Sequence, residues 1–172
     1  MPSLQNLQKA MVKQGVSPVI MAQMDFDATG CDAVFAVIEK MDELMTESQR
    51  YEVIEQLGCC KTGQRDRDCK AFAKLHKDKP LTEKLDLIKN VQHMADNRLN
   101  DDGTLSLFMG CIGMKEIAGC SCGDMKKRAK PASITYCGCC GGHFRYHYQN
   151  ALGIKLKLIR IMAGEFVYEI AG

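Results

Sequence analysis

The spacing of the apolar residues changes near Asn100, and this change constrains the fold of the chain more than any other feature. Before it, apolar side chains recur every three or four residues, as they do along one face of a helix. After the turn-forming sequence Asn100-Asp101-Asp102-Gly103, short segments alternate between apolar and polar residues, which is typical of strands. The pattern predicts an α+β protein in which a helical part, residues 1–100, packs with a cysteine-rich antiparallel sheet domain, residues 101–172, as one compact unit.

Helical spacing in the first part extends to about Arg98, and the starts of two helices are marked by capping residues. Ser17 precedes a proline at the first helical position, and Thr46 with Gln49 three residues later forms a capping box. The expected helices span about residues 4–12, 18–28, 31–44, 47–57, 66–74 and 81–95.

The second part is expected to contain one helix and several short strands. The helix is indicated by a stripe of Phe144, Tyr148 and Leu152, and Gly153 stands where a helix often ends. The strongest strand signal is a carboxy-terminal hairpin that turns at Ala163-Gly164. The expected segments are the strands 104–109, 134–136, 155–162 and 165–170, and the helix 143–152.

Composition excludes several classes of function. Charged residues make up 26% of the 172-residue chain, and a net charge of +2 gives no argument for a nucleic-acid partner. No apolar run is long enough to span a membrane, and the amino terminus lacks the features of a secretory signal, so a cytoplasmic location is expected. Ten cysteines in such a location favour reduced thiols that bind a metal or carry out thiol chemistry.

The stretch from Tyr136 to Tyr148 gathers these thiols most densely, with three cysteines and two histidines inside eleven residues. Its glycines at 138, 141 and 142 suggest a backbone that folds tightly around an ion or an anion. The sequence therefore predicts a zinc site, with an iron–sulfur cluster as the all-thiolate alternative. The candidate ligands are Cys137, Cys139, Cys140 and His143, with Cys120, Cys122 or Cys60 completing the set. The two separated C-x-x-C knuckles of a zinc ribbon are absent, which disfavours nucleic-acid binding through a ribbon.

Three other interpretations stay open. In the first, the protein is a hydrolase that acts on a C–N or C–S bond of a small molecule. Either a Cys140 thiolate assisted by His143 or a metal-bound water attacks the bond, and Arg145 and Lys155 hold a substrate carboxylate. The second is redox or ligand sensing through the pairs Cys120 with Cys122 and Cys139 with Cys140, which lack the C-x-x-C spacing of oxidoreductases. In the third, the sulfurs only fill a core, as is expected of Cys69. Separately, His76 and His93 are expected at the surface.

The order C-x-C-C-G-G-H-F-R-x-H-Y-Q-x-x-L-G from Cys137 to Gly153, followed by K-L-K-L and a terminal hairpin, resembles a group of uncharacterised bacterial proteins frequent in anaerobes. That group is similar to the L-2-amino-thiazoline-4-carboxylic acid hydrolase family and, more remotely, to the four-vinyl reductase domain, a small-molecule sensing module. The resemblance covers mainly residues 104–172 and implies an α+β domain with a site between a helix and an antiparallel sheet. Such families often carry a cysteine at the entrance to the last strand, where this chain has Gly164-Glu165-Phe166.

Overall fold

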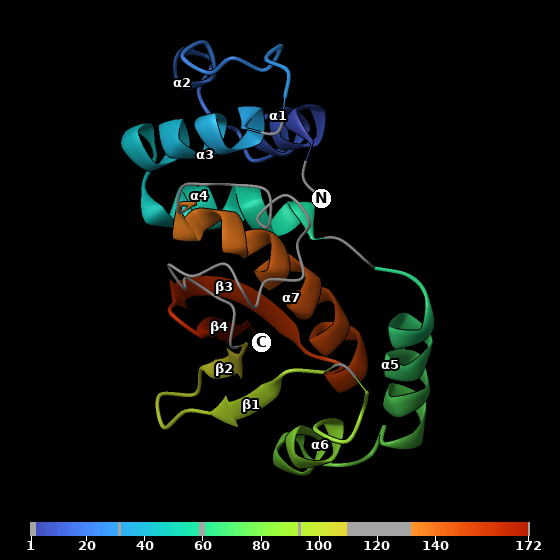
Figure 1. Ribbon diagram of the computed structural model, residues 1–172. Helices are drawn as coiled ribbons and strands as arrows, with labels where there is room; N and C mark the ends of the chain where they lie inside the picture. The colour runs from blue at the N-terminus through green and yellow to red at the C-terminus, as the bar shows by residue number, and fades with distance from the viewer. Residues whose placement is uncertain (1–2, 31, 59–60, 93, 110–131, 172) are drawn as a thin grey trace.

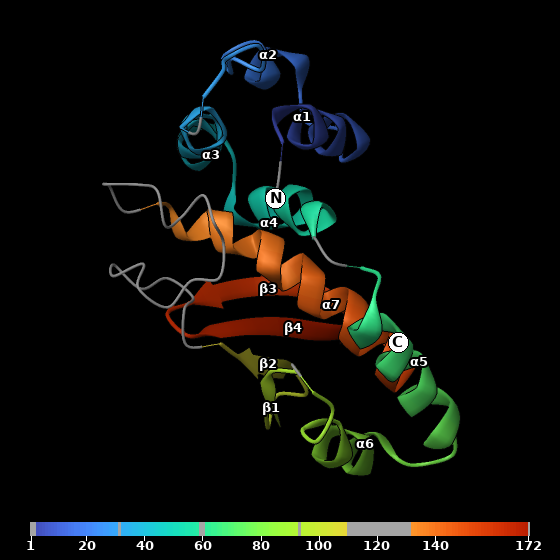
Figure 2. The same cartoon turned by 45° about the vertical axis from the view of Figure 1, so that its right-hand side comes forward.

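The computed structural model of the chain describes residues 3–30, 32–58, 61–92, 94–109 and 132–171. Over these residues the fold is α+β, as predicted, with helices in the amino-terminal part and a four-stranded antiparallel sheet formed mainly by the carboxy-terminal part. One long helix, α7 (Gly138–Leu152), lies between the amino-terminal helices and the sheet (Figures 1 and 2). No helix in the described ranges is long and apolar enough to cross a membrane.

The first helices follow the predicted caps closely. The hydroxyl of Ser17 accepts a hydrogen bond from the backbone N–H of Val19 at the start of α2, and the predicted capping box of Thr46 and Gln49 is present at the start of α4. Ser3, which was not predicted as a cap, accepts a hydrogen bond from the backbone N–H of Asn6 at the start of α1. The elements are α1 (Leu4–Lys13), α2 (Pro18–Met21), α3 (Ala33–Leu44), α4 (Glu47–Ile54) and the 3-10 helix η1 (Glu55–Leu57). Their buried apolar faces form one cluster, in which Leu7, Met11 and Met41 have no exposed surface.

Two helices are shorter than predicted: the one expected over residues 81–95 ends at Ile88, and the second helix is also cut short. It ends at Met21 instead of continuing to residue 28. Beyond it, the carboxylate of Asp25 accepts a hydrogen bond of 3.1 Å from the backbone N–H of Asp27, which closes a local turn in place of another helical turn.

Two further helices, α5 (Gln64–Leu75) and α6 (Leu81–Ile88), lead into a strand that lies where the sequence analysis still expected helical spacing. This strand, β1 (Asp96–Leu99), pairs antiparallel with β2 (Leu105–Phe108) across the predicted turn. The expectation of helical structure out to Arg98 is therefore wrong. Pairing with β2 decides the conformation, and Asn97 is buried with its amide donating to the carbonyl of Leu85 at 3.1 Å.

The sheet has the order β1-β2-β4-β3, and the carboxy-terminal hairpin forms its longer half. Its strands β3 (Lys155–Met162) and β4 (Glu165–Ala171) match the predicted hairpin to within one residue. The outer edge of β3 is closed by side chains: Gln149 accepts from the backbone N–H of Leu156 at 2.8 Å, and Glu55 accepts from that of Leu158 at 3.3 Å. Side chains of α7 and η1 thus cover an edge that would otherwise expose unpaired backbone groups.

Helix α7 packs its apolar stripe on this sheet. Phe144, Tyr148 and Leu152 are buried in the same cluster as the sheet residues Leu158 and Phe166, as the predicted helical stripe requires. The helix begins at Gly138, five residues earlier than predicted, and the segment before it is a 3-10 helix, η4 (Ile134–Cys137), instead of the predicted strand 134–136. The cysteine motif is therefore helical throughout.

Candidate functional site

The three cysteines of the central motif occupy the start of α7. Cys137 is the N-cap residue and already has helical backbone angles (φ −64°, ψ −19°), and Cys139 and Cys140 are the second and third residues of the helix. Just upstream, the hydroxyl of the buried Thr135 donates to the carboxylate of Asp42 at 2.7 Å. That contact ties η4 to α3 and so holds the start of α7 in place.

The sulfurs leave the helix in two directions. Cys139 is buried, and its thiol donates to the carbonyl oxygen of Leu57 in η1 at 3.3 Å. Cys137 and Cys140 are partly exposed and pack against the sheet-side cluster. Their three-residue spacing places both on the same side of the helix. Within the described ranges, no three or more His, Cys, Asp or Glu side chains form a group that could hold a metal ion.

His143 and His147 are buried one turn apart, with ring centroids separated by 4.6 Å. Nη1 of Arg65 in α5 lies within hydrogen-bond reach of Nε2 of His143. A guanidinium only donates, so Nε2 of a neutral His143 is the acceptor and its ring proton is assigned to Nδ1. A cation at Nε2 would compete with this guanidinium, which weighs against His143 as a ligand through that atom.

The next residue of α5 continues the polar contact with α7. The hydroxyl of Tyr146 donates to Asp66 at 3.1 Å, and the ammonium of Lys70 lies 2.8 Å from the same carboxylate. The hydrogen bond from Lys70 is the main cause of a lowered pKa of Asp66. Arg65 and Asp66 lie 78 and 80 residues before His143 and Tyr146. No spacing rule could therefore have identified them from the sequence as contacts of α7.

The predicted substrate-binding residues have other surroundings. Arg145 pairs with Glu55, a carboxylate that is only 4% exposed. Burial raises the pKa of Glu55, and the charge of Arg145 opposes that rise. Lys155 is exposed at the beginning of β3, and no described contact joins it to Arg145. The described contacts thus do not bring the two residues together as a pair that would hold a carboxylate.

The glycines of the motif have a packing role that differs from the one expected. A Cβ atom at Gly142 would lie 2.6 Å from the carbonyl carbon of Glu55 and still nearer its oxygen, and one at Gly138 would overlap the side chain of Ile54. A Cβ at Gly58 would in turn lie 2.6 Å from the backbone nitrogen of His143. Gly142 and Gly58 let α7 approach η1 and the residue after it backbone to backbone, and Gly138 leaves room for the side chain of Ile54. They do not form the predicted tight turn around an ion.

Several predicted site residues lie outside the described residues, namely Cys60, Cys120 and Cys122, as do Cys59 and His93. Described residues beside two of these segments make contacts with distant parts of the chain. Gly58, which precedes Cys59, packs against Gly142 and His143. At the other segment, the backbone N–H of Met109 donates to Gly164 at 2.9 Å, at the turn of the carboxy-terminal hairpin.

Cys69 and His76 take the roles that packing predicts for them, with one difference. Cys69 is fully buried, its thiol lies 3.9 Å from the sulfur of Met94, and burial raises its pKa to about 11. The expectation that it belongs to the core is confirmed. His76, expected at the surface, is half-buried with its ring centroid 4.5 Å from that of Phe72.

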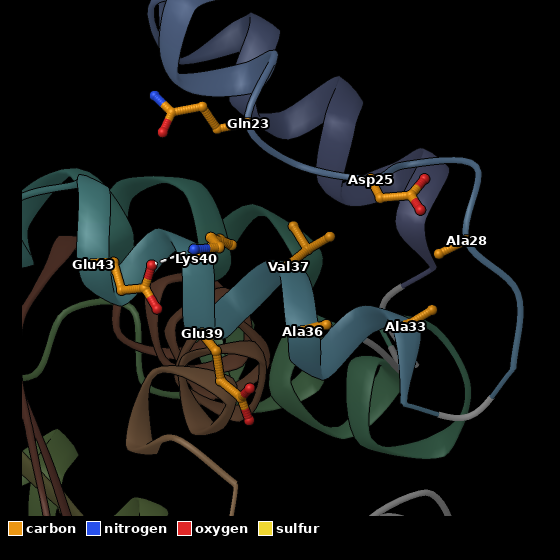
Figure 3. Close-up of a pocket in the computed structure, with 9 residues that line it drawn as sticks. All are labelled: Gln23, Asp25, Ala28, Ala33, Ala36, Val37, Glu39, Lys40 and Glu43. Carbon is orange, nitrogen blue, oxygen red and sulfur yellow. Dashed lines mark hydrogen bonds and ion pairs between the residues drawn. The ribbon is translucent and has the colours of Figure 1, made fainter.

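Two of the hollows near the amino-terminal helices differ in their distance from the cysteine motif. One, of about 360 Å³, runs between α3 and the segment after α2; Ala33, Ala36 and Val37 line it, and Lys40 pairs with Glu43 at its rim (Figure 3). No cysteine or histidine is among its described lining residues. The other, of about 390 Å³, adjoins the site because Leu57 lines it; its charged lining residues are all lysines, at 9, 13 and 61.

The sequence analysis overlooked one pair that the structure makes evident. Cys137 and Cys140 are themselves separated by two residues, although attention to the vicinal pair Cys139-Cys140 hid this spacing. The C-x-x-C interval was readable from the chain. That both cysteines fall at a helix start, with Cys139 turned toward η1, required the fold.

Comparison of the chain with models of protein families, with curated proteins and with solved structures finds no significant match. The similarity to the hydrolase family therefore rests on the motif residues alone.

Proposed function

We propose that the protein binds a zinc ion through thiolates at the start of α7, with Cys137 and Cys140 as the ligands that the helix contributes. The observation that carries this proposal is their placement at the N-cap and third helical positions, on one side of the helix and partly exposed. Two cysteines separated by two residues are a common half of a structural zinc site. Zinc binds thiolates, and the dipole of a helix favours thiolates over thiols in its first turn.

The other ligands are assigned by the chemistry of the donors. Zinc in a structural site takes four ligands of the thiolate or imidazole type. His143 is disfavoured through Nε2 by the adjacent guanidinium of Arg65, and Cys139 faces the carbonyl of Leu57. We therefore assign the remaining positions to two of the three sequence candidates Cys60, Cys120 and Cys122.

The contacts of Gly58 support Cys60 as one of these ligands. Gly58 precedes Cys60 by two residues in the chain and packs against Gly142 and His143 of α7. An iron–sulfur cluster is the alternative occupant, because it is also bound by thiolates.

Elemental analysis of protein purified without chelator tests the proposal. We expect about one zinc ion per chain in the wild type, and the same content in Cys69→Ala, whose thiol is buried in the core. Cys137→Ser and Cys140→Ser should each lose most of the metal. Iron with a visible absorption band would indicate the cluster instead. Wild-type protein without metal after expression with added zinc, or serine variants that keep it, would refute the assignment.

Hydrolysis of a small molecule is the alternative suggested by the motif resemblance, with Cys140 as nucleophile and His143 as base. Two contacts weigh against it. Nε2 of His143 lies against Arg65, and Arg145 is neutralised by Glu55, so neither is available for the role expected of it without rearrangement. For this reason we rank metal binding in a reducing, cytoplasmic environment above hydrolysis.

A further inference from the structure

We propose that Cys137 and Cys140 also form a reversible disulfide, by thiol–disulfide exchange with a small-molecule disulfide, and that this oxidation releases the bound metal. The formation of the disulfide depends only on the two cysteines. Its regulatory consequence rests on the proposed zinc site, because the same sulfurs cannot be zinc ligands once they are bonded to each other.

The backbone geometry suits this bond. Because Cys137 already has helical backbone angles, Cys137 and Cys140 have the geometry of residues i and i+3 of a helix. Such residues have Cβ atoms about 5–6 Å apart, and a disulfide needs about 3.5–4.5 Å, so a modest local adjustment closes the gap. Cys139 competes poorly for a disulfide with either cysteine. Its thiol is hydrogen-bonded to the carbonyl of Leu57, and Cys140, directly next to it in sequence, is badly placed for an ordinary disulfide with it.

Exposure separates the pair from the other described thiols. Cys137 and Cys140 are partly exposed, whereas Cys139 and Cys69 are buried. Thiol–disulfide exchange requires the incoming disulfide to reach the attacking sulfur, and a buried side chain prevents this. The pair is therefore accessible to a small disulfide, and the two buried thiols are not.

The surrounding packing holds the turn that links the two cysteines. Gly138 lies directly against Ile54, and the hydroxyl of Tyr168 donates to the carbonyl of Gly141 at 2.8 Å. Together with the hydrogen bond between Thr135 and Asp42, these contacts keep the two cysteines on one helical turn. Two thiols kept close together in one chain react with each other at a high effective concentration.

The exchange is balanced by the added disulfide. One thiolate attacks a sulfur of the small disulfide RSSR, which forms a mixed disulfide and releases RS⁻. The second thiolate then attacks the protein sulfur of the mixed disulfide, which forms the intramolecular bond and releases a second RS⁻. The protein loses two electrons, RSSR gains two, and an excess of dithiothreitol reverses the sequence.

Peptide mapping of the full chain tests the inference. Two samples are compared: protein as purified, and protein stripped of metal by a chelator under reducing conditions. Each is incubated with bis(2-hydroxyethyl) disulfide and quenched in acid. The remaining thiols are then alkylated with N-ethylmaleimide, and the protein is digested with trypsin. The peptide that ends at Arg145 contains Cys137, Cys139 and Cys140. We expect it to carry one maleimide group, on Cys139, and to regain three after reduction.

Matched variants within the same peptide identify the bond. Cys139→Ser should form the disulfide as the wild type does, whereas Cys137→Ser and Cys140→Ser should yield only mixed disulfides or alkylated thiols. Three alkylated cysteines in stripped wild-type protein, or a bond that includes Cys139, would overturn the inference. The disulfide is tested on metal-stripped protein, whereas the zinc site is tested by the metal content of purified protein. Either proposal can therefore fail without the other.

Discussion

Gly142 offers the most direct test of how the cysteine-bearing helix is held. In a helix interior, alanine is normally more favourable than glycine by about 1 kcal/mol. At this position an added Cβ would lie 2.6 Å from the carbonyl carbon of Glu55 and 2.9 Å from its Cα. Since carbon atoms in contact are about 3.5–4.0 Å apart, the Gly142→Ala variant must move two backbone segments apart by about 1 Å.

The expected cost exceeds the gain in helix propensity. Overpacking of an interior costs about 1–3 kcal/mol, and the upper part of that range applies because the obstacle is backbone. Glu55 cannot yield easily, as its side chain is paired with Arg145 and accepts from the N–H of Leu158. We expect a net destabilisation of about 2 kcal/mol, which lowers the melting temperature by about 4–8 °C in a protein of this size.

Gly141→Ala is the matched control. Its Cβ would lie 3.0 Å from a methyl group of Leu158 and 3.3 Å from a ring atom of Phe166, both of which belong to side chains that can shift. The gain in helix propensity is the same at both positions, so the difference between the variants measures packing alone. Thermal and urea unfolding should place Gly141→Ala within about 1 kcal/mol of the wild type. The packing argument is wrong if Gly142→Ala is as stable as Gly141→Ala.

Two further predictions concern titratable groups. Burial raises the pKa of Glu55 above its usual value of 4.5 in the folded state, so its stabilising contribution is complete below that value and declines as the pH rises. Glu55→Gln does not titrate and loses about 1–2 kcal/mol of hydrogen bonding. In urea unfolding, its free energy of unfolding should therefore fall furthest below that of the wild type near pH 4, and the gap should be smaller near pH 7. A gap that grows with pH would contradict this. Since burial raises the pKa of Cys69 to about 11, its thiolate fraction at neutral pH is at least about 100-fold below that of an ordinary thiol. In metal-free protein, alkylation followed by mass spectrometry should find Cys69 to react at least about 100-fold more slowly than Cys137 and Cys140, and comparable rates would show that it is not a core residue.

The predictions that the structure confirms have causes that act over a few residues. The capping box of Thr46 and Gln49 forms as expected, with Gln49 accepting from the N–H of Thr46 at 3.0 Å. The hairpin of β3 and β4 follows from alternating side chains around Ala163-Gly164. In each case the residues that decide the structure are neighbours in the chain.

The predictions that failed depend on partners that are distant in sequence or on packing. The strand β1 resembles the end of a helix in its spacing, and its conformation comes from pairing with β2. The early start of α7 has a similar origin. Glycines normally weaken a helix, but here they allow it to pack against Ile54 and the backbone of Glu55, and that packing compensates for their low propensity.

The sequence by itself determined that this chain is α+β, that it ends in a hairpin and that its thiols gather around residues 137–140, because these properties depend on composition and on spacing along the chain. The tertiary structure decided how the thiols are used. It turned Cys139 toward η1, left Cys137 and Cys140 together on the other side, and paired His143 and Arg145 with Arg65 and Glu55. The physical reason is that the direction of a side chain on a helix is set by what the helix packs against, and α7 is enclosed by elements that lie far from it in the sequence.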